Sequence, residues 1–180
     1  GQPNETPAAR EIVGNINRLA KEVRQAGGTV IWVQTSSARA LERWGKHHRH
    51  MLSEERAAKR IAGLAEDSEG FALYPGLDTM PEDLYVKKTT YSAMIRDSSS
   101  LEDEMRRRGI ESLLIAGTTT NVCCESTARD AMLLDYRVVV LSDATAATTL
   151  EEHVASLNNI ALYFGDVMTV DEAAERLIKG

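Results

Sequence analysis

The stretch Glu111-Ser-Leu-Leu-Ile-Ala-Gly-Thr-Thr-Thr-Asn-Val-Cys-Cys124 decides the fold. Its apolar first part predicts a buried strand over 111–117, and the run of polar residues after it predicts a turn. A helix over roughly 122–135 and a further strand over 136–142 are expected to follow. Strand, crossover helix and strand in this order are typical of a parallel sheet. Cys123 then falls in the first turn of the crossover helix.

The same alternation of helices and strands continues on both sides of this stretch. Thr6 and Pro7 predict the start of a helix that ends at Gly27 and Gly28. The other expected elements are a strand over 29–34, an irregular excursion at one sheet edge over 36–82 with a helix near 53–65, a strand over 84–88, and helices over 100–108, 150–163 and 171–179 with a short strand near 167–170. The pattern predicts a single α/β domain over residues 1–180, a three-layer doubly wound fold with a mostly parallel sheet and helices on both faces.

The fold class predicts where a ligand binds. Ligands of doubly wound sheets bind outside the carboxyl ends of the strands. The residues just after Gln34, Lys88 and Gly117 are therefore expected to meet at one crevice.

Composition excludes several classes of partner. The chain has 180 residues, 43% of them hydrophobic, and a formal net charge of −6, so it offers no basic surface for nucleic acid. No apolar run approaches the ~20 residues of a membrane span, and no signal peptide is recognisable. The adjacent Cys123 and Cys124 are expected to be free thiols in a reducing compartment. We therefore expect a cytoplasmic protein with neither nucleic acid nor membrane as a partner.

Cys123 is a candidate nucleophile because of its position. Free backbone amides and the helix dipole at a helix N-terminus favour a thiolate and provide donors for an oxyanion. The alternative is a small buried hydrophobic residue, and position alone leaves both possibilities open. Cys124 points to a different side of the helix and is expected to be structural.

Beyond position, the sequence resembles a known family. The segment Gly117–Ala131 is similar to the signature of the isochorismatase-like cysteine hydrolases, and the resemblance covers about residues 7–175. Further matching segments are Lys88–Ala93, Leu101, Arg108–Ile110, Tyr136–Val140 and Ser142–Thr145. The resemblance implies a Rossmann-like fold, a reaction without a cofactor, and a homodimer or homotetramer.

The resemblance also implies roles for individual residues. Cys123 corresponds to the nucleophile and Lys88 to the catalytic lysine, although a solvated strand-end lysine like Lys87 is the alternative. Strand alternation sends Lys87 and Lys88 to opposite faces, so at most one of them enters the crevice. A cis peptide is implied between Thr118 and Thr119, with the amides of Thr119 and Cys123 as the oxyanion hole.

One member of the family's catalytic set has no counterpart. The family has an acid/base aspartate at the end of a first strand, and the sequence contains no segment like it. The aspartate is expected upstream of residue 1, in which case the domain over 1–180 lacks the first strand. The alternative is a divergent member without the base. Glu5, Asp97 and Asp143 cannot be assigned this role from sequence.

Candidate substrate-binding residues lie near the strand ends. They are Gln34, Tyr91 and Asn121, with Gln34 placed to hydrogen-bond a ureido or carboxylate group. Trp32, two residues before Gln34, is expected to pack in the core, and Tyr91 either lines the pocket or packs beneath it. His47, His48 and His50 are expected to form a solvated loop, and no metal is expected because no carboxylate stands at ligand spacing.

The family resemblance, together with the position of Cys123, implies a cysteine-dependent hydrolase. It is expected to cleave a C–N bond of a small amide or ureido compound through a thioester. Two alternatives remain: a vinyl ether hydrolase of the isochorismatase type, and a catalytically silent binding member of the family.

Overall fold

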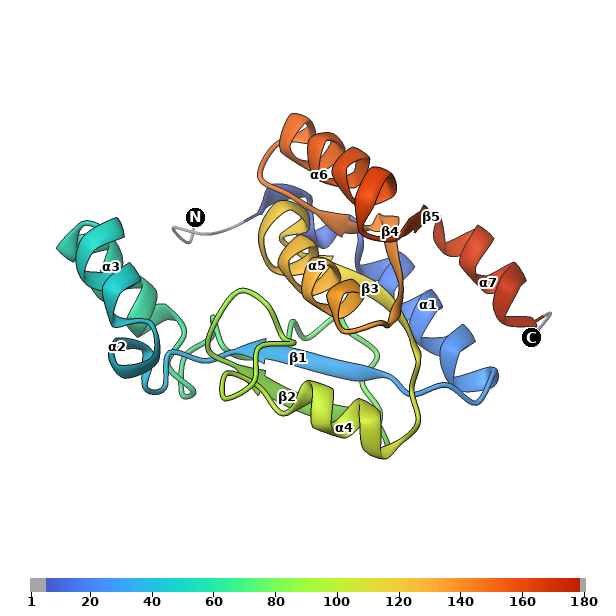
Figure 1. Ribbon diagram of the computed structural model, residues 1–180, viewed down its shortest axis with the longest axis horizontal. Helices are drawn as coiled ribbons and strands as arrows, with labels where there is room; N and C mark the ends of the chain where they lie inside the picture. The colour runs from blue at the N-terminus through green and yellow to red at the C-terminus, as the bar shows by residue number, and fades with distance from the viewer. Residues whose placement is uncertain (1–5, 179–180) are drawn as a thin grey trace.

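The structure is a computed structural model in which residues 6–178 are described, so the first five and last two residues of the predicted domain lie outside the described part. Its helices and strands alternate along the chain (Figure 1). The strands are β1 (Ile31–Thr35), β2 (Leu84–Lys88), β3 (Ser112–Thr118), β4 (Arg137–Ala146) and β5 (Asp166–Met168). The helices are α1 (Val13–Gln25), α2 (Ala40–Arg43), α3 (Glu54–Gly63), α4 (Leu101–Arg107), α5 (Glu125–Leu133), α6 (Leu150–Tyr163) and α7 (Val170–Ile178). Shorter helical turns are Pro7–Arg10, His47–Met51 and Thr120–Cys124.

All strand pairs are parallel, as predicted, but they form two sheets. β1 pairs with β2, and β3, β4 and β5 form a second sheet in that order. In Figure 1 the β1–β2 pair lies beside the three-stranded sheet, with β1 nearer to β3 than β2 is. Within the described residues, β1 pairs only with β2 and β3 only with β4, so each has one unpaired edge.

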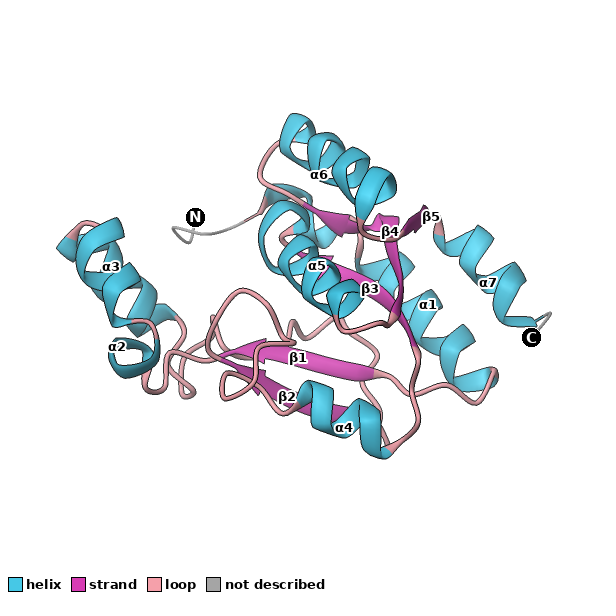
Figure 2. Ribbon diagram, viewed as in Figure 1, coloured by secondary structure: helices cyan, strands magenta, loops and turns pink. Residues whose placement is uncertain are grey.

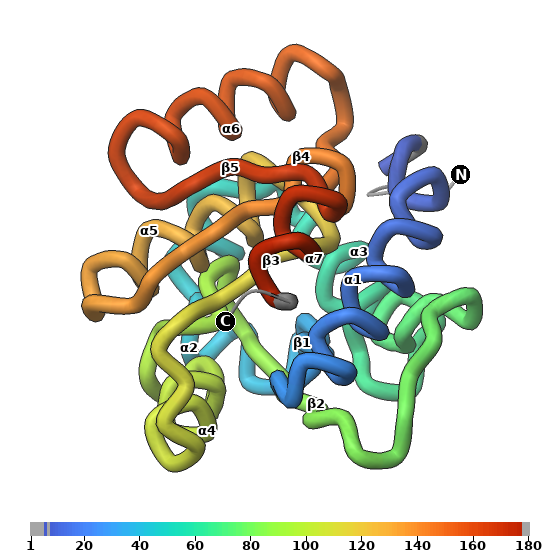
Figure 3. Tube along the Cα trace, turned by 90° about the vertical axis from the view of Figure 1, so that its right-hand side faces the viewer, coloured from blue at the N-terminus to red at the C-terminus, as the bar shows by residue number. Residues whose placement is uncertain are grey.

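Helices cover both faces of the three-stranded sheet. In Figures 1 and 3, α5 and α6 lie on one face, and α1 and α7 lie together on the other. The predicted α/β fold with helices on both faces of a parallel sheet is confirmed. Figure 2 shows α2 and α3 standing away from the sheets, which agrees with the excursion expected over residues 36–82.

Local sequence explains where the main elements form. Val86 and Lys88 of β2 are buried while Tyr85 and Lys87 are exposed, the alternation expected of a strand with one covered face. α6 begins with a capping box in which Thr149 and Glu152 satisfy each other's backbone amides.

β4 ends later than the sequence predicts. β4 continues to Ala146, four residues beyond the predicted end at 142, because Thr145 and Ala146 pair with Gly117 and Thr118 of β3. The register between the two strands shifts between Ile115 and Gly117. Gly117 has φ +110°, a value that side-chain-bearing residues rarely adopt.

The main hydrophobic core joins the two sheets. It contains Val86 from β2 together with Val138 and Val140 from β4, and β1 and β3 contribute partly buried residues such as Val33 and Ile115. Packing of apolar side chains therefore connects the sheets where backbone hydrogen bonds do not. None of the helices among residues 6–178 has the length and apolar character needed to cross a membrane.

Candidate active site

The side chains of Lys88 and Cys123 meet between the two sheets. Lys88 Nζ donates a hydrogen bond to Cys123 Sγ over 3.4 Å. The same nitrogen donates to the carbonyl oxygens of Thr90 at 2.9 Å and Tyr91 at 2.8 Å. Lys88 is only 4% exposed, and Cys123 is half-buried. Three acceptors therefore hold the lysine with one of its hydrogens directed at the sulfur.

Strand pairing explains why Lys88, and not Lys87, reaches the thiol. Lys88 is in register with Thr35, whereas Lys87 is in register with Gln34. Residues in register share a face of the sheet, so the two lysines point to opposite faces. Lys87 is exposed and forms an ion pair with Glu66 at 2.5 Å.

Cys123 lies in the π-helical turn Thr120–Cys124, which runs directly into α5. The peptide bond between Thr118 and Thr119 is cis, and Thr119 has an extended backbone that precedes the turn. The carbonyl oxygen of Thr119 accepts hydrogen bonds from the amides of Val122 and Cys124, both at 3.2 Å. The turn therefore folds around the Thr119 carbonyl. The oxyanion role of the Thr119 and Cys123 amides stays a prediction.

Cys124 differs from its neighbour in burial. It is 4% exposed, and burial together with the adjacent Cys123 raises the pKa of its thiol to about 12, although Lys88 opposes the shift. Cys124 is therefore protonated near neutral pH and packs as a small apolar residue. Of the two thiols, Cys123 alone has a sulfur in contact with the lysine.

Side chains of α6 hold the turn that carries Cys123. Ser156 Oγ donates to the carbonyl oxygen of Thr120 at 3.3 Å and to Glu125 Oε2 at 2.6 Å. His153 Nδ1 lies 2.9 Å from Thr120 Oγ1. Thr120 is fully buried, so these contacts fix the backbone on both sides of Cys123. These contacts were not predicted from the sequence, although the polar residues His153, Ser156 and Asn159, spaced three apart on one helix, were a possible signal.

Glu125 is the centre of this network. Its Oε1 accepts hydrogen bonds from Asn159 at 2.7 Å and from Arg129 at 2.6 Å. Burial raises the pKa of Glu125, but hydrogen bonds from Ser156, Arg129 and Asn159 outweigh it and lower the pKa. Glu125 therefore carries a negative charge that is neutralised locally.

Gln34 does not share a face of the sheet with Lys88. It is in register with Lys87, and its Nε2 donates to the carbonyl oxygen of Phe71 at 3.0 Å. The expectation that Gln34 binds substrate beside Cys123 is therefore not supported by its position, because strand alternation turns it to the opposite face. Trp32 shares that face and is 7% exposed, and its Nε1 donates to Asp83 at 2.7 Å.

The other two predicted substrate-binding residues lie near Cys123 in the chain or in space. Asn121 is half-buried in the same helical turn as Cys123. Tyr91 contributes its carbonyl oxygen to Lys88, and its ring packs edge-on against Trp44 with the centroids 4.6 Å apart. Their roles in binding substrate stay predictions.

The histidines after β1 do not form the solvated loop that the sequence suggested. His48 is 4% exposed, and its Nδ1 lies 2.9 Å from the carbonyl oxygen of Trp44. The ring of His47 stacks on Trp44, and the ring of His48 packs edge-on against it. These contacts shield both histidines from solvent. Only His50 is exposed. Among residues 6–178, no three histidine, cysteine or acidic side chains come together as a metal site.

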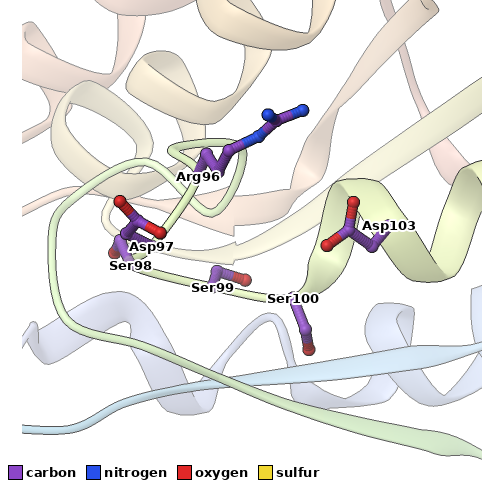
Figure 4. Close-up of a pocket in the computed structure, with 6 residues that line it drawn as sticks. All are labelled: Arg96, Asp97, Ser98, Ser99, Ser100 and Asp103. Atoms are coloured by element: carbon purple, nitrogen blue, oxygen red, sulfur yellow. The ribbon is translucent and has the colours of Figure 1, made fainter.

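An open hollow lies on the loop between β2 and α4. Figure 4 shows the residues that line it: Arg96, Asp97, Ser98, Ser99, Ser100 and Asp103. Ser98 Oγ accepts hydrogen bonds from the amides of Thr89 and Thr90, so this serine braces the loop that follows Lys88. The hollow includes neither Lys88 nor Cys123, and we do not place the substrate there.

Among the described residues, no carboxylate contacts Lys88 Nζ or Cys123 Sγ through a hydrogen bond or an ion pair. Asp143, considered above, accepts from the amide of Val170 at 2.8 Å, and Asp97 pairs with Arg43. Glu5 lies outside the described residues.

Several known proteins are similar to this chain in sequence and in fold. The chain is 35% identical over 175 residues to the ureidoacrylate amidohydrolase RutB of Variovorax paradoxus (strain S110), a match that covers 91% of this chain and 68% of the relative. The ureidoacrylate amidohydrolase RutB of Stutzerimonas stutzeri (strain A1501) is also 35% identical, with 91% and 69% covered. A solved structure of a cysteine hydrolase from Pseudomonas syringae pv. phaseolicola 1448A superposes with a TM-score of 0.82 at 27% identity, covering 97% of this chain and 83% of that one.

The family model gives the same result. The model described as the isochorismatase domain matches residues 1–172, which include the lysine, the turn and the thiol described above. The resemblance predicted from Gly117–Ala131 is confirmed. The chain belongs to the isochorismatase family.

Proposed function

We propose that this protein is a cysteine-dependent amidohydrolase that cleaves a non-peptide C–N bond of a small amide or ureido compound. The observation that carries the proposal is the 3.4 Å contact between Lys88 Nζ and Cys123 Sγ at a turn leading into a helix. The ureidoacrylate amidohydrolase relatives support the same reaction class.

The first half of the reaction forms a thioester. The Cys123 thiolate attacks the carbonyl carbon, a C–S bond forms, and the carbonyl oxygen becomes an oxyanion. The amides of Thr119 and Cys123 stabilise this oxyanion. The C–N bond then breaks, and the leaving amine takes up a proton from a general acid.

The second half releases the acid product. A general base removes a proton from water, the water attacks the thioester carbon, and the C–S bond breaks. Cys123 leaves as the thiolate that began the cycle. Lys88 stabilises negative charge on the sulfur in both halves, because its Nζ is held beside the sulfur by the carbonyls of Thr90 and Tyr91.

We place the general acid and base outside residues 6–178. The unpaired edges of β1 and β3 would accept one more parallel strand between the two sheets. The carboxyl end of such a strand would lie beside those of β1 and β3, near Lys88 and Cys123. An aspartate at that end would complete the catalytic set that the family resemblance implies.

We test the reaction by ammonia release from a panel of primary amides and N-carbamoyl compounds. We expect Cys123→Ser to abolish release and Cys124→Ser, the matched control at the buried thiol, to retain it. Mass spectrometry of the intact protein during turnover is expected to show an acyl or carbamoyl adduct that Cys123→Ser lacks. Wild-type protein that releases no ammonia and forms no adduct, yet binds the same compounds, would instead indicate a catalytically silent binding member.

The test also addresses the vinyl ether alternative. That reaction does not use a cysteine nucleophile. Turnover of isochorismate by the Cys123→Ser variant would therefore contradict the thioester mechanism.

We also propose that the protein forms a homodimer or homotetramer through α6. Exposed apolar side chains gather on this helix and its end, among them Leu150, Val154, Leu162 and Tyr163. Light scattering behind size exclusion measures the mass in solution, and Leu162→Glu is expected to shift it to the monomer.

For location we propose the cytoplasm. A mechanism based on the free thiol of Cys123 requires a compartment that keeps thiols reduced. Localisation of a fluorescent fusion in cells tests this proposal.

A further inference from the structure

An aromatic cluster, made of Trp44, His47, His48 and Tyr91, lies next to the catalytic pair. The ring of His47 stacks on Trp44 with centroids 4.3 Å apart and planes 17° from parallel. Tyr91 packs edge-on against Trp44 at 4.6 Å and against His47 at 6.0 Å. The cluster joins the excursion after β1 to the loop after β2, two segments far apart in the sequence.

The cluster carries a cation. The guanidinium of Arg60, from α3, lies 5.8 Å from the ring centroid of Trp44 and 5.4 Å from that of Tyr91. Among the described residues, the guanidinium of Arg60 forms no ion pair and no side-chain hydrogen bond. Arg43, by contrast, forms an ion pair with Asp97 at 3.5 Å. Aromatic faces hold a guanidinium without using its N–H groups, which stay free to bind an anion.

His47 provides a second free group at the same place. Its Nε2 is buried and has no hydrogen-bond partner among the described residues. Burial, the neighbouring His48 and the charge of Arg60 lower the pKa of His47, so its ring is neutral near neutral pH. A buried nitrogen without a partner is unfavourable, and an acceptor oxygen from a ligand would satisfy it in the N–H form.

The cluster is contiguous with the catalytic pair through Tyr91. The carbonyl oxygen of Tyr91 accepts a hydrogen bond from Lys88 Nζ at 2.8 Å, and the same Nζ contacts Cys123 Sγ. The backbone of Tyr91 therefore connects the cluster that holds Arg60 and His47 to the catalytic pair. In a chain of net charge −6, an arginine without an acidic partner is a selective place for an anion.

We propose that Arg60 and His47 bind the carboxylate of the substrate and thereby select acidic amides and ureido acids over neutral ones. The guanidinium pairs with the carboxylate, the Nε2–H of His47 donates to one of its oxygens, and the amide or carbamoyl group extends to Cys123. The inference rests on the proposed hydrolase function, because it describes how the substrate of that reaction is chosen.

The test compares an acidic substrate with a neutral one of the same length. 3-Ureidopropionate carries the carboxylate, and N-butylurea replaces it with an ethyl end. We expect wild-type protein to prefer 3-ureidopropionate, and Arg60→Gln to raise its KM by about 10- to 100-fold, the effect of losing a charge-assisted pair. The kinetics of N-butylurea are expected to stay unchanged in this variant.

Two further variants control for charge and for folding. Arg56→Gln removes the same charge from an exposed position of the same helix and is expected to leave both substrates unaffected. Arg60→Lys keeps the charge without the planar fork and is expected to give an intermediate KM. Equal losses for both substrates in Arg60→Gln, or no loss for either, would overturn the inference.

Binding separates this inference from the proposed function. Calorimetry with Cys123→Ala measures the affinity for 3-ureidopropionate without turnover, before and after Arg60→Gln. If the wild type hydrolyses no compound but binding of 3-ureidopropionate depends on Arg60, the hydrolase function is wrong and the carboxylate site stands. If hydrolysis occurs and neither KM nor binding depends on Arg60, the carboxylate site is wrong and the hydrolase function stands.

Discussion

Lys88 Nζ and Cys123 Sγ lie 3.4 Å apart, although the lysine ends a strand of one sheet and the cysteine follows a strand of the other. The lysine is buried and also bound to two backbone carbonyls, so it has little freedom to turn away from the sulfur. A cation fixed beside the sulfur stabilises the negative charge of the thiolate that attacks carbonyl carbon.

Replacing Lys88 tests this relationship, and Lys87 supplies the control. We expect Lys88→Met to lower kcat by on the order of 10²- to 10⁴-fold, because the thiolate loses its neighbouring charge. Alkylation of Cys123 by iodoacetamide at neutral pH is expected to slow in parallel. Lys87→Met, on the opposite face of β2, is expected to change neither rate. Equal effects of the two substitutions would show that the lysine acts through general charge and not through its position.

Cys124 predicts how stability changes at alkaline pH. Burial raises the pKa of Cys124 to about 12 in the folded chain, above its ordinary value of 9.0. Between these values the unfolded chain loses a proton that the folded chain keeps, so the free energy of unfolding falls as pH rises. One such proton changes it by about 1.4 kcal/mol per pH unit. The free energy of unfolding, measured with urea between pH 8 and pH 11, is therefore expected to fall less steeply for Cys124→Ala than for the wild type. Parallel pH profiles for the two proteins would contradict the assignment.

The carboxylate of Asp83 is expected to make the stability of the protein depend on pH in the acidic range. Burial raises its pKa, but hydrogen bonds from Arg24, Trp32 and the amide of Met80 outweigh burial and lower the pKa. A lowered pKa contributes stability above the ordinary value, about 4, and that stability is lost as pH falls through the lowered pKa.

We therefore expect Asp83→Asn to destabilise the protein by about 3 kcal/mol at pH 7, because it leaves the largely buried Arg24 without its partner. The difference from the wild type is expected to shrink as pH falls below the ordinary value of about 4, because the unfolded chain then takes up a proton that the folded carboxylate does not yet hold. Asp67→Asn, at an exposed position, is the control and is expected to change little. A difference that persists unchanged at low pH would show that shape, and not charge, is responsible. Chemical denaturation as a function of pH measures the loss of stability at pH 7 and its change at low pH.

Ser156 is expected to position the nucleophile without touching it. Ser156→Ala removes the donor shared by the Thr120 carbonyl and the Glu125 carboxylate, at a cost of about 1 to 2 kcal/mol in stability. We expect kcat to fall by several-fold with KM nearly constant, since the turn that aims Cys123 loosens while the carboxylate site is intact. Asn158→Ala, exposed on the same helix, serves as the control. A loss of stability at unchanged kcat would limit Ser156 to a structural role.

Most of the fold followed from local patterns in the sequence. The strand predicted over 84–88 is β2, and the helix predicted over 150–163 is α6. Both succeed because strand alternation and the Thr149 cap are local signals. The helix predicted over 171–179 is α7, which ends at Ile178, and residue 179 lies outside the described part.

The residues around the candidate site were harder to predict because their partners are distant in sequence. Gln34 was assigned to the crevice from its place at a strand end, but the register between β1 and β2 turns it to the Lys87 face. Register is set by tertiary packing, which a single sequence does not display. The histidines after β1 were expected in solvent because their segment is basic, and the contact with Trp44 decides otherwise. Arg60 has no sequence signal at all, since its role depends on rings from two other segments.

The core shared by the two sheets has a consequence for how the chain tolerates mutation. Side chains packed between β2, which carries Lys88, and β3, which leads to Cys123, help to set the separation of the two groups. A substitution that empties part of that core, such as Met105→Ala, is therefore expected to disturb this separation as well as to destabilise the fold. Variation in this interior is thus restrained twice, once by the need to stay folded and once by the spacing of two reactive atoms.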